Sequence, residues 1–108
     1  MQLVLLETTK LATLLAKEHN INFTKIKINN KGKWGSCSSK AVLAFNWHLI
    51  FAPKKILKYL VTHEICHIIE MNHSPRFWNL VAILYPDYKL ARLWLKEHGN
   101  TLHQYLMS

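Results

Sequence analysis

The first half of the chain passes from a helical to an alternating spacing of apolar residues. Residues 2–19 carry leucines mostly at helical spacing, which predicts an amphipathic first helix. Residues 20–28 alternate lysine or threonine with apolar side chains, which predicts a strand, and the turn signal NNKG follows. Residues 33–39 and 41–50 predict two further strands. The leucines at this spacing are Leu3, Leu6, Leu11, Leu14 and Leu15.

The second half of the chain predicts three helices. The longest apolar run begins at Pro53, which suits the first position of a helix, and continues to about Asn72. Its apolar residues occupy nearly every side of the helical wheel, so this helix is expected in the core. Ser74, followed by a proline, is typical of an N-cap and a first helical residue, so a new helix begins there. A last helix is predicted over residues 86–100 with its stop at Gly99.

The order of these elements predicts the fold class. One helix, three strands and then three helices indicate an α+β domain with a small antiparallel or mixed sheet beside a buried helix. No internal repeat, low-complexity tract or linker interrupts the chain of 108 residues. We therefore expect a single domain over residues 1–108.

The charge and the cysteines narrow the class of protein. Fourteen Lys and Arg against six Asp and Glu favour anionic partners, and nucleic acid is one of them. The lysines are scattered, however, so a solvated basic surface explains them better than a dedicated nucleic-acid site. Two cysteines cannot make a disulfide framework, and the N-terminal segment fits neither a secretion signal nor a membrane span. We expect a cytoplasmic protein.

Residues 62–78, THEICHIIEMNHSPRFW, place ionisable side chains in the most apolar helix. His63 and His67 are four residues apart, so they lie on one helix face, about 6 Å apart along the axis. Both imidazoles could reach one zinc ion at about 2.0–2.1 Å. Glu64 lies at the flank of this pair and could hold a water on the metal as a general base. This is the H-E-x-x-H arrangement of zinc peptidases.

His73 supplies a third candidate ligand only if the chain turns before it. In a continuous helix it would lie about 240° round from His67 and point away. Asn72 tolerates a left-handed backbone, and a new helix begins directly after Ser74, so the sequence offers such a turn. Three protein ligands leave a fourth position for water, which is typical of a catalytic zinc site.

The other residues near the motif have simpler explanations. Cys66 is expected to be a buried, inert thiol. Glu70 is either a hydrogen-bond acceptor for a ligand imidazole or a solvated residue at the helix end. Surface or capping roles are expected for the remaining histidines, which are His19, His48, His98 and His103.

Two stretches carry a resemblance to a known family. KWGSCSSKAVLAFNWHLIFAP and YLVTHEICHIIEMNHSPRFWNLV, together within residues 33–81, resemble the YgjP-like metallopeptidase domain. That domain is a small gluzincin-type zincin related to the SprT-like and minigluzincin groups. The combination of W-G-S-C with H-E-x-x-H-x5-H-S-x-x-F-W is more specific than the zinc motif alone. The metzincins have the same spacing of three histidines, but Glu70 stands where they have a glycine. This difference argues against membership of the metzincin branch.

The resemblance implies a zincin-like minimal domain whose buried helix carries the active site. In it, His63, His67 and His73 are the ligands of one Zn2+ ion, and Glu64 deprotonates the attacking water. An extended peptide would pair with the edge of the three-stranded sheet through main-chain hydrogen bonds. Arg76 is followed by two aromatic residues, Phe77 and Trp78. The resemblance implies that both are core residues that fix the turn after the helix.

The predicted function is therefore zinc-dependent hydrolysis of peptides or unfolded proteins. The donor for the oxyanion stays open among Tyr85, Tyr88, Tyr105 and Arg76. A basic zinc domain that binds nucleic acid without catalysis is an alternative, since four tryptophans and the positive charge suit single strands. A protease acting on DNA-bound proteins, by analogy with SprT-like relatives, and a hydrolase of non-peptide amides are two others.

Overall fold

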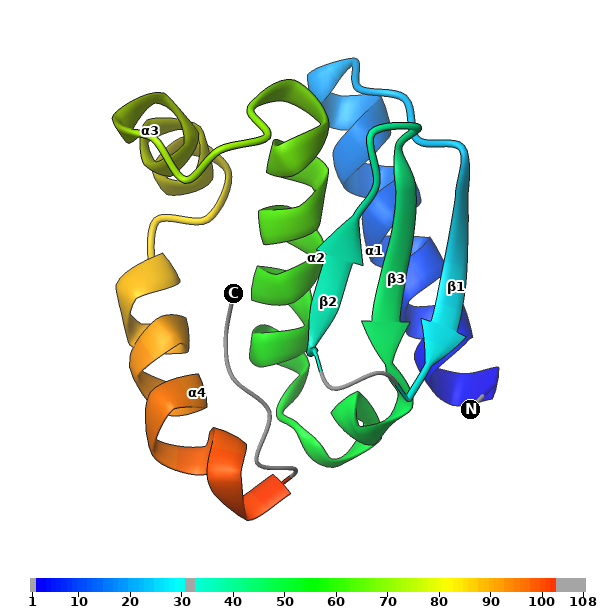
Figure 1. Ribbon diagram of the computed structural model, residues 1–108, viewed down its shortest axis with the longest axis vertical. Helices are drawn as coiled ribbons and strands as arrows, with labels where there is room; N and C mark the ends of the chain where they lie inside the picture. Colours follow the sequence, from blue (N-terminus) through cyan, green and yellow to red (C-terminus); the bar gives the residue numbers. More distant parts are fainter. Residues whose placement is uncertain (1, 31–32, 103–108) are drawn as a thin grey trace.

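A central helix, α2, lies between the sheet with α1 on one side and the helices α3 and α4 on the other (Figure 1). The computed structural model describes residues 2–30 and 33–102. The predicted α+β class, with a small sheet beside a buried helix, is confirmed. The elements are α1 (Gln2–His19), β1 (Lys25–Asn29), β2 (Gly35–Cys37), β3 (Val42–Asn46), the 3-10 helix η1 (Trp47–Phe51), α2 (Lys54–Ile69), α3 (Pro75–Leu84) and α4 (Tyr88–Leu102).

The sheet is mixed and has the strand order β1-β3-β2. The middle strand, β3, runs parallel to β1 and antiparallel to β2. Its Leu43 and Phe45 are fully buried, and Phe45 pairs with Gly35 of β2. β2 is an edge strand, and it contacts α2, the helix that carries the H-E-x-x-H motif.

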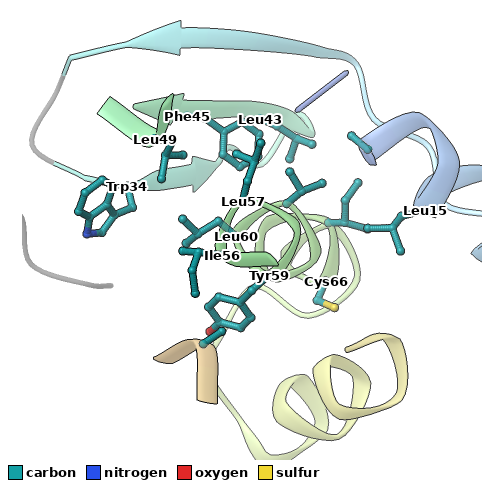
Figure 2. Close-up of a cluster of buried hydrophobic side chains, with 14 of the residues drawn as sticks. Leu15, Trp34, Leu43, Phe45, Leu49, Ile56, Leu57, Tyr59, Leu60 and Cys66 are labelled. Atoms are coloured by element: carbon teal, nitrogen blue, oxygen red, sulfur yellow. The ribbon is translucent and has the colours of Figure 1, made fainter. Parts of the chain in front are cut away.

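The core surrounds α2. Every residue from 59 to 67 is buried, which confirms the prediction of a helix in the core. Figure 2 shows Leu57 and Leu60 of this helix, with Phe45 of β3 and Trp34 among the side chains around them. His63, Glu64 and His67 of the motif are therefore buried together with the rest of this helix. Within the described ranges, none of the helices combines the length and apolar character that a bilayer span requires.

The strand predicted over residues 41–50 is too long. It ends at Asn46, and the chain continues as η1. The Asn46 side-chain oxygen accepts a hydrogen bond from the His48 backbone N–H at 2.9 Å, which caps the short helix. A side chain that bonds its own backbone competes with strand pairing in this way.

Three predicted helix boundaries are also wrong. Pro53 is the N-cap of α2 and not its first residue, and α2 ends at Ile69 instead of reaching Asn72. α4 continues through Gly99 to Leu102, so this glycine does not stop it.

The face of α1 that packs on the core matches the predicted one only in part. Leu15 is buried as predicted, whereas Leu3, Leu6 and Leu14 are exposed. Val4, Thr8 and Ala12 are buried although the leucine pattern does not predict it. The Thr8 hydroxyl donates to the Val4 carbonyl oxygen at 2.7 Å, so its burial leaves no polar group unpaired.

Candidate metal centre

The three histidines of the motif converge on one point. His63 and His67 lie one turn apart on α2, and His73 comes from the loop after it. The Nε2 atom of His73 lies 3.0 Å from that of His67 and 3.3 Å from that of His63. All three ligand atoms lie within 4.8 Å of one another. The structure thus brings together the three residues that the spacing singled out.

The turn that delivers His73 is made without a left-handed residue. After Ile69, the backbone of Glu70 becomes extended, with φ −126° and ψ 101°. The left-handed backbone that Asn72 tolerates is not used, because among the described non-glycine residues only Asn20 and Ala41 have a positive φ. The change from helical to extended backbone at one residue is enough to redirect the chain.

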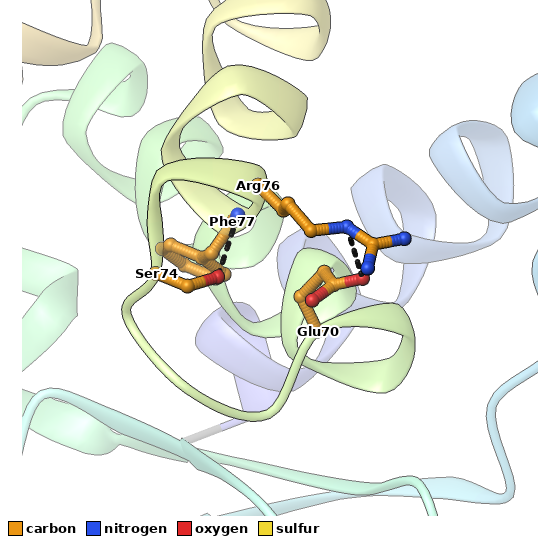
Figure 3. Close-up of polar contacts among 4 residues, drawn as sticks. All are labelled: Glu70, Ser74, Arg76 and Phe77. Carbon is orange, nitrogen blue, oxygen red and sulfur yellow. Dashed lines mark hydrogen bonds and ion pairs between the residues drawn. The ribbon is translucent and has the colours of Figure 1, made fainter.

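Side-chain contacts close this turn from both ends (Figure 3). The Ser74 hydroxyl accepts a hydrogen bond from the Phe77 backbone N–H at 3.3 Å, as expected of an N-cap. Arg76 in the first turn of α3 reaches back to Glu70, with 3.7 Å between Nε and Oε2. The end of α2 and the start of α3 are therefore tied together around His73.

The second ring nitrogens of the two α2 histidines are also held. The Nδ1 of His67 lies 3.0 Å from the Glu70 carbonyl oxygen, which can only accept, so this nitrogen carries the hydrogen. The Nε2 of His67 then keeps its lone pair for the centre of the cluster. The Nδ1 of His63 lies 3.0 Å from the Tyr59 hydroxyl. Of the two roles predicted for Glu70, the acceptor role belongs to its backbone, while its carboxylate pairs with Arg76.

Aromatic rings form the wall behind the imidazoles. Phe77 is fully buried and stacks on His67 with 4.3 Å between ring centres. Its edge contacts the rings of His63 and His73 at 5.0 and 5.1 Å. Trp78 is half-buried and stacks on His73 at 5.8 Å. Both residues pack around the turn, in agreement with the expectation from the sequence.

This donor set fits a divalent cation. Burial, with the neighbouring charges of His67 and His73, lowers the pKa of His63 to about 3. Burial also lowers the pKa of His67. Neutral imidazole is the form that binds metals, and three nitrogen donors crowded at one point suit zinc.

Glu64 of α2 lies against the sheet. Only 2% of it is exposed, and burial raises the pKa of its carboxyl to about 8, while the charge of Lys33 lowers it. Its Oε2 faces Gly35 of β2, since a Cβ on that glycine would lie 3.1 Å away. The carboxyl group therefore lies against the edge strand β2.

Several expected roles outside the cluster agree with the structure. The ring of His48 bonds the Asn46 side chain at 2.9 Å, and His98 bonds a backbone carbonyl of its own helix at 3.0 Å. Cys66 is fully buried, and burial raises the pKa of its thiol to about 12, as expected of an inert thiol. His103 lies outside the described residues.

Three residues near the site were missed by the analysis of the sequence. Tyr59 precedes His63 by one helical turn, and this spacing could have suggested a partner for the imidazole. Gly35 lies within the W-G-S-C segment, where a glycine in a strand is a signal of close approach. Arg92 of α4 lies over the ring of Trp78, and no local pattern in the sequence predicts this contact.

An α+β fold whose central buried helix joins a three-histidine cluster to a glutamate defines a zinc metallopeptidase of the zincin type. The model of the YgjP-like metallopeptidase domain matches residues 2–98, so the chain belongs to this family. The predicted resemblance and the predicted enzyme class are thereby confirmed. No curated protein sequence gives a significant match.

Two solved structures share the fold. The metallopeptidase zymogen abylysin of Pyrococcus abyssi aligns with a TM-score of 0.75 and 18% identity, over 94% of this chain and 99% of that chain. The metallopeptidase zymogen jannalysin of Methanocaldococcus jannaschii aligns with a TM-score of 0.70 and 20% identity, over 83% of this chain and 94% of that chain. At these identities the likeness establishes the shared fold.

Proposed function

We propose that the chain hydrolyses peptide bonds in peptides or unfolded proteins at one zinc ion bound by His63, His67 and His73. Membership of a metallopeptidase family supports the peptide substrate. The observation that carries the proposal is the convergence of three Nε2 atoms beside a buried carboxyl group. We also propose that residues 1–108 act as one domain.

A zinc ion held by His63, His67 and His73 would supply Lewis acidity that activates water and polarises the scissile carbonyl. Glu64 accepts the proton of the attacking water and passes it to the leaving amine. The position of its carboxyl group against Gly35 supports this role, because an extended substrate added to the free edge of β2 would pass beside it. Tyr59 and the Glu70 carbonyl hold the two α2 imidazoles in orientation.

The contacts of the four candidate residues favour one of them as the hydrogen-bond donor to the oxyanion. The Tyr85 hydroxyl donates to the Lys55 carbonyl oxygen at 3.0 Å, and Arg76 pairs with Glu70, so both have other partners. Tyr105 lies outside the described residues. Tyr88 stacks on Trp78 at 5.6 Å and so lies against the aromatic wall of the site. We propose Tyr88 as the donor, with Tyr88→Phe as the variant that tests it.

The basic charge would attract the protein to DNA, and the extended proposal is that its substrate is a protein bound to DNA in the cytoplasm. The excess of fourteen basic over six acidic residues supports this extension, and the peptide chemistry does not depend on it. It predicts an affinity for DNA that falls steeply with salt concentration. A salt-independent affinity, or none, removes the extension and leaves the peptidase.

The test combines metal analysis with cleavage of casein. Wild type is expected to bind one zinc per chain and to cleave, Glu64→Gln to bind zinc without cleaving, and His73→Ala to lose most of the zinc. Because both structural neighbours are described as zymogens, a chain ending at Leu102 is assayed in parallel. Cleavage by Glu64→Gln at the wild-type rate contradicts the role of this residue. Full zinc binding by His73→Ala contradicts the ligand set.

A further inference from the structure

The two arginines of the chain have different surroundings. Arg76 is paired with Glu70 across the turn after α2. Arg92, an exposed residue of α4, has its guanidinium carbon 4.3 Å from the ring centre of Trp78. In the part of the chain that the structure describes, Arg92 forms no ion pair with a carboxylate. Its position is therefore fixed by an aromatic ring while its charge stays available.

The ring that holds Arg92 belongs to the wall of the metal centre. Trp78 stacks on His73 and meets the ring of His63 edge-on, each with 5.8 Å between ring centres. Tyr88, one turn before Arg92 on α4, stacks on the same indole. Arg92 and Tyr88 thus both pack on the ring that packs on the histidines.

The position of Arg92 on α4 decides what it can contact. A donor to the oxyanion must lie about 2.7–3.1 Å from that atom, next to the metal. Arg92 follows the proposed donor Tyr88 by one helical turn, about 6 Å along the axis, so it suits a group one or two residues away along a substrate, where each extended residue spans about 3.3–3.6 Å. The guanidinium fork matches a carboxylate and binds it through two parallel hydrogen bonds.

The other charges of the chain have on balance the same sign as Arg92. Lys33 lies just before β2, and Nζ of Lys58 in α2 lies 6.0 Å from the ring centre of Tyr85. The whole chain carries a formal net charge of +8. A substrate carboxylate would therefore be attracted to the protein as a whole, and the fixed guanidinium would select its position.

We propose that Arg92, positioned by Trp78, determines substrate specificity by binding a carboxylate of the substrate on the α4 side of the scissile bond. This inference rests on the proposed peptidase function. The carboxylate is either the C-terminus of a short peptide or the side chain of an acidic residue. Both offer the same planar acceptor, and the peptides described next distinguish them.

The experiment uses one peptide sequence in four forms, with Glu or Gln near the scissile bond and with a free or an amidated C-terminus. Wild type, Arg92→Gln and Arg92→Lys are compared with Lys96→Gln, which removes the same charge from an exposed position of the same helix. We measure kcat and KM for each peptide. We also measure the dissociation constants of the peptides with each substitution placed in the Glu64→Gln background, which reports binding without turnover.

Wild type is expected to prefer one carboxylate form over its neutral counterpart by about 10-fold or more, the size of a charge-assisted hydrogen bond. In Arg92→Gln this preference is expected to disappear, because KM and the dissociation constant of the carboxylate peptide rise to those of the neutral peptide. The kcat for the neutral peptide is unchanged. Arg92→Lys keeps part of it, since a point charge replaces the fork. If wild type prefers the free C-terminus over the amide, the carboxylate bound by Arg92 is that of the C-terminus. If wild type prefers Glu over Gln, the bound carboxylate is that of an acidic side chain.

Three results overturn the inference. Equal cleavage of all four peptides by wild type removes the specificity and leaves the peptidase function intact. An equal loss in Arg92→Gln and Lys96→Gln indicates general charge attraction and no defined subsite. Absence of both cleavage and binding for every peptide contradicts the proposed function together with the inference. Thermal unfolding and zinc content of each variant establish that the compared proteins are folded.

Discussion

Replacement of Gly35 by alanine tests where the Glu64 carboxyl group lies. The added Cβ would be 3.1 Å from Glu64 Oε2, 3.3 Å from its Cγ and 3.3 Å from Cδ1 of Phe45. Carbon atoms prefer separations of about 3.5–4.0 Å, so the neighbours must move by a few tenths of an ångström. Phe45 is fully buried in the core and paired in β3, which leaves Glu64 as the group that moves.

The expected cost has two parts. Overpacking a buried site destabilises a protein by about 1–3 kcal/mol, which urea unfolding measures. Displacement of the base lowers kcat/KM by about 10-fold, given that a 1 Å misplacement can cost on the order of 100-fold. Zinc binding is expected to be unchanged, because the added methyl group faces Glu64 and Phe45 and none of the three histidines.

Ser36→Ala is the matched control, because adjacent strand residues point to opposite faces and this change adds no atom. It should leave peptide cleavage within about twofold of wild type, since surface substitutions of this kind cost little. Wild-type kcat/KM in folded Gly35→Ala refutes the placement of the Glu64 carboxyl group against β2. Loss of zinc from folded Gly35→Ala refutes the separation of the base from the ligands.

Four further predictions concern the surroundings of the site. Tyr59→Phe removes the hydroxyl bonded to Nδ1 of His63 and should weaken zinc affinity by about 10-fold or more in competition with a chelator; unchanged affinity would show that the hydroxyl does not orient the ring. Phe77→Ala should lower the free energy of unfolding by about 3–5 kcal/mol in urea, and a loss as small as a surface change would contradict its burial. Ser74→Ala should cost about 1 kcal/mol in thermal unfolding through loss of the N-cap, whereas an unchanged melting temperature would exclude that bond. Burial raises the pKa of the Cys37 thiol from 9.0 to about 11, so the folded thiol loses its proton at a higher pH than the unfolded one. The free energy of unfolding should then fall as the pH rises above 9, and iodoacetamide at pH 9 should alkylate the folded chain more slowly than the unfolded chain, with equal rates contradicting the burial.

The sequence was sufficient for the elements that local chemistry determines. The all-round apolar pattern of residues 54–69 predicts a core helix, and the four-residue spacing of His63 and His67 predicts a shared face. The cap at Ser74 predicts the restart of the helix and hence a turn that could deliver His73, which the structure contains. These features depend on neighbours within one or two turns of the chain.

Other features depend on contacts that no local pattern encodes. The parallel pairing of β1 with β3 joins segments that are distant in sequence, and the pattern left antiparallel and mixed sheets open. On α1 the leucines predict the packed face only in part, because Leu15 is buried whereas Leu3 and Leu6 are exposed. Val4 and Ala12 complete this face, and the leucine pattern does not predict them. Arg92 reaches the site only because α4 folds back onto Trp78 of α3.

The central claim is that a single zinc ion is bound at the meeting point of three imidazoles. A crystal grown with zinc, measured on both sides of the zinc absorption edge, locates the ion directly by its anomalous signal. We predict one strong peak at about 2.0–2.1 Å from Nε2 of His63, His67 and His73. A peak at any other side chain, or an imidazole of residue 73 turned away from the ion, would contradict the account.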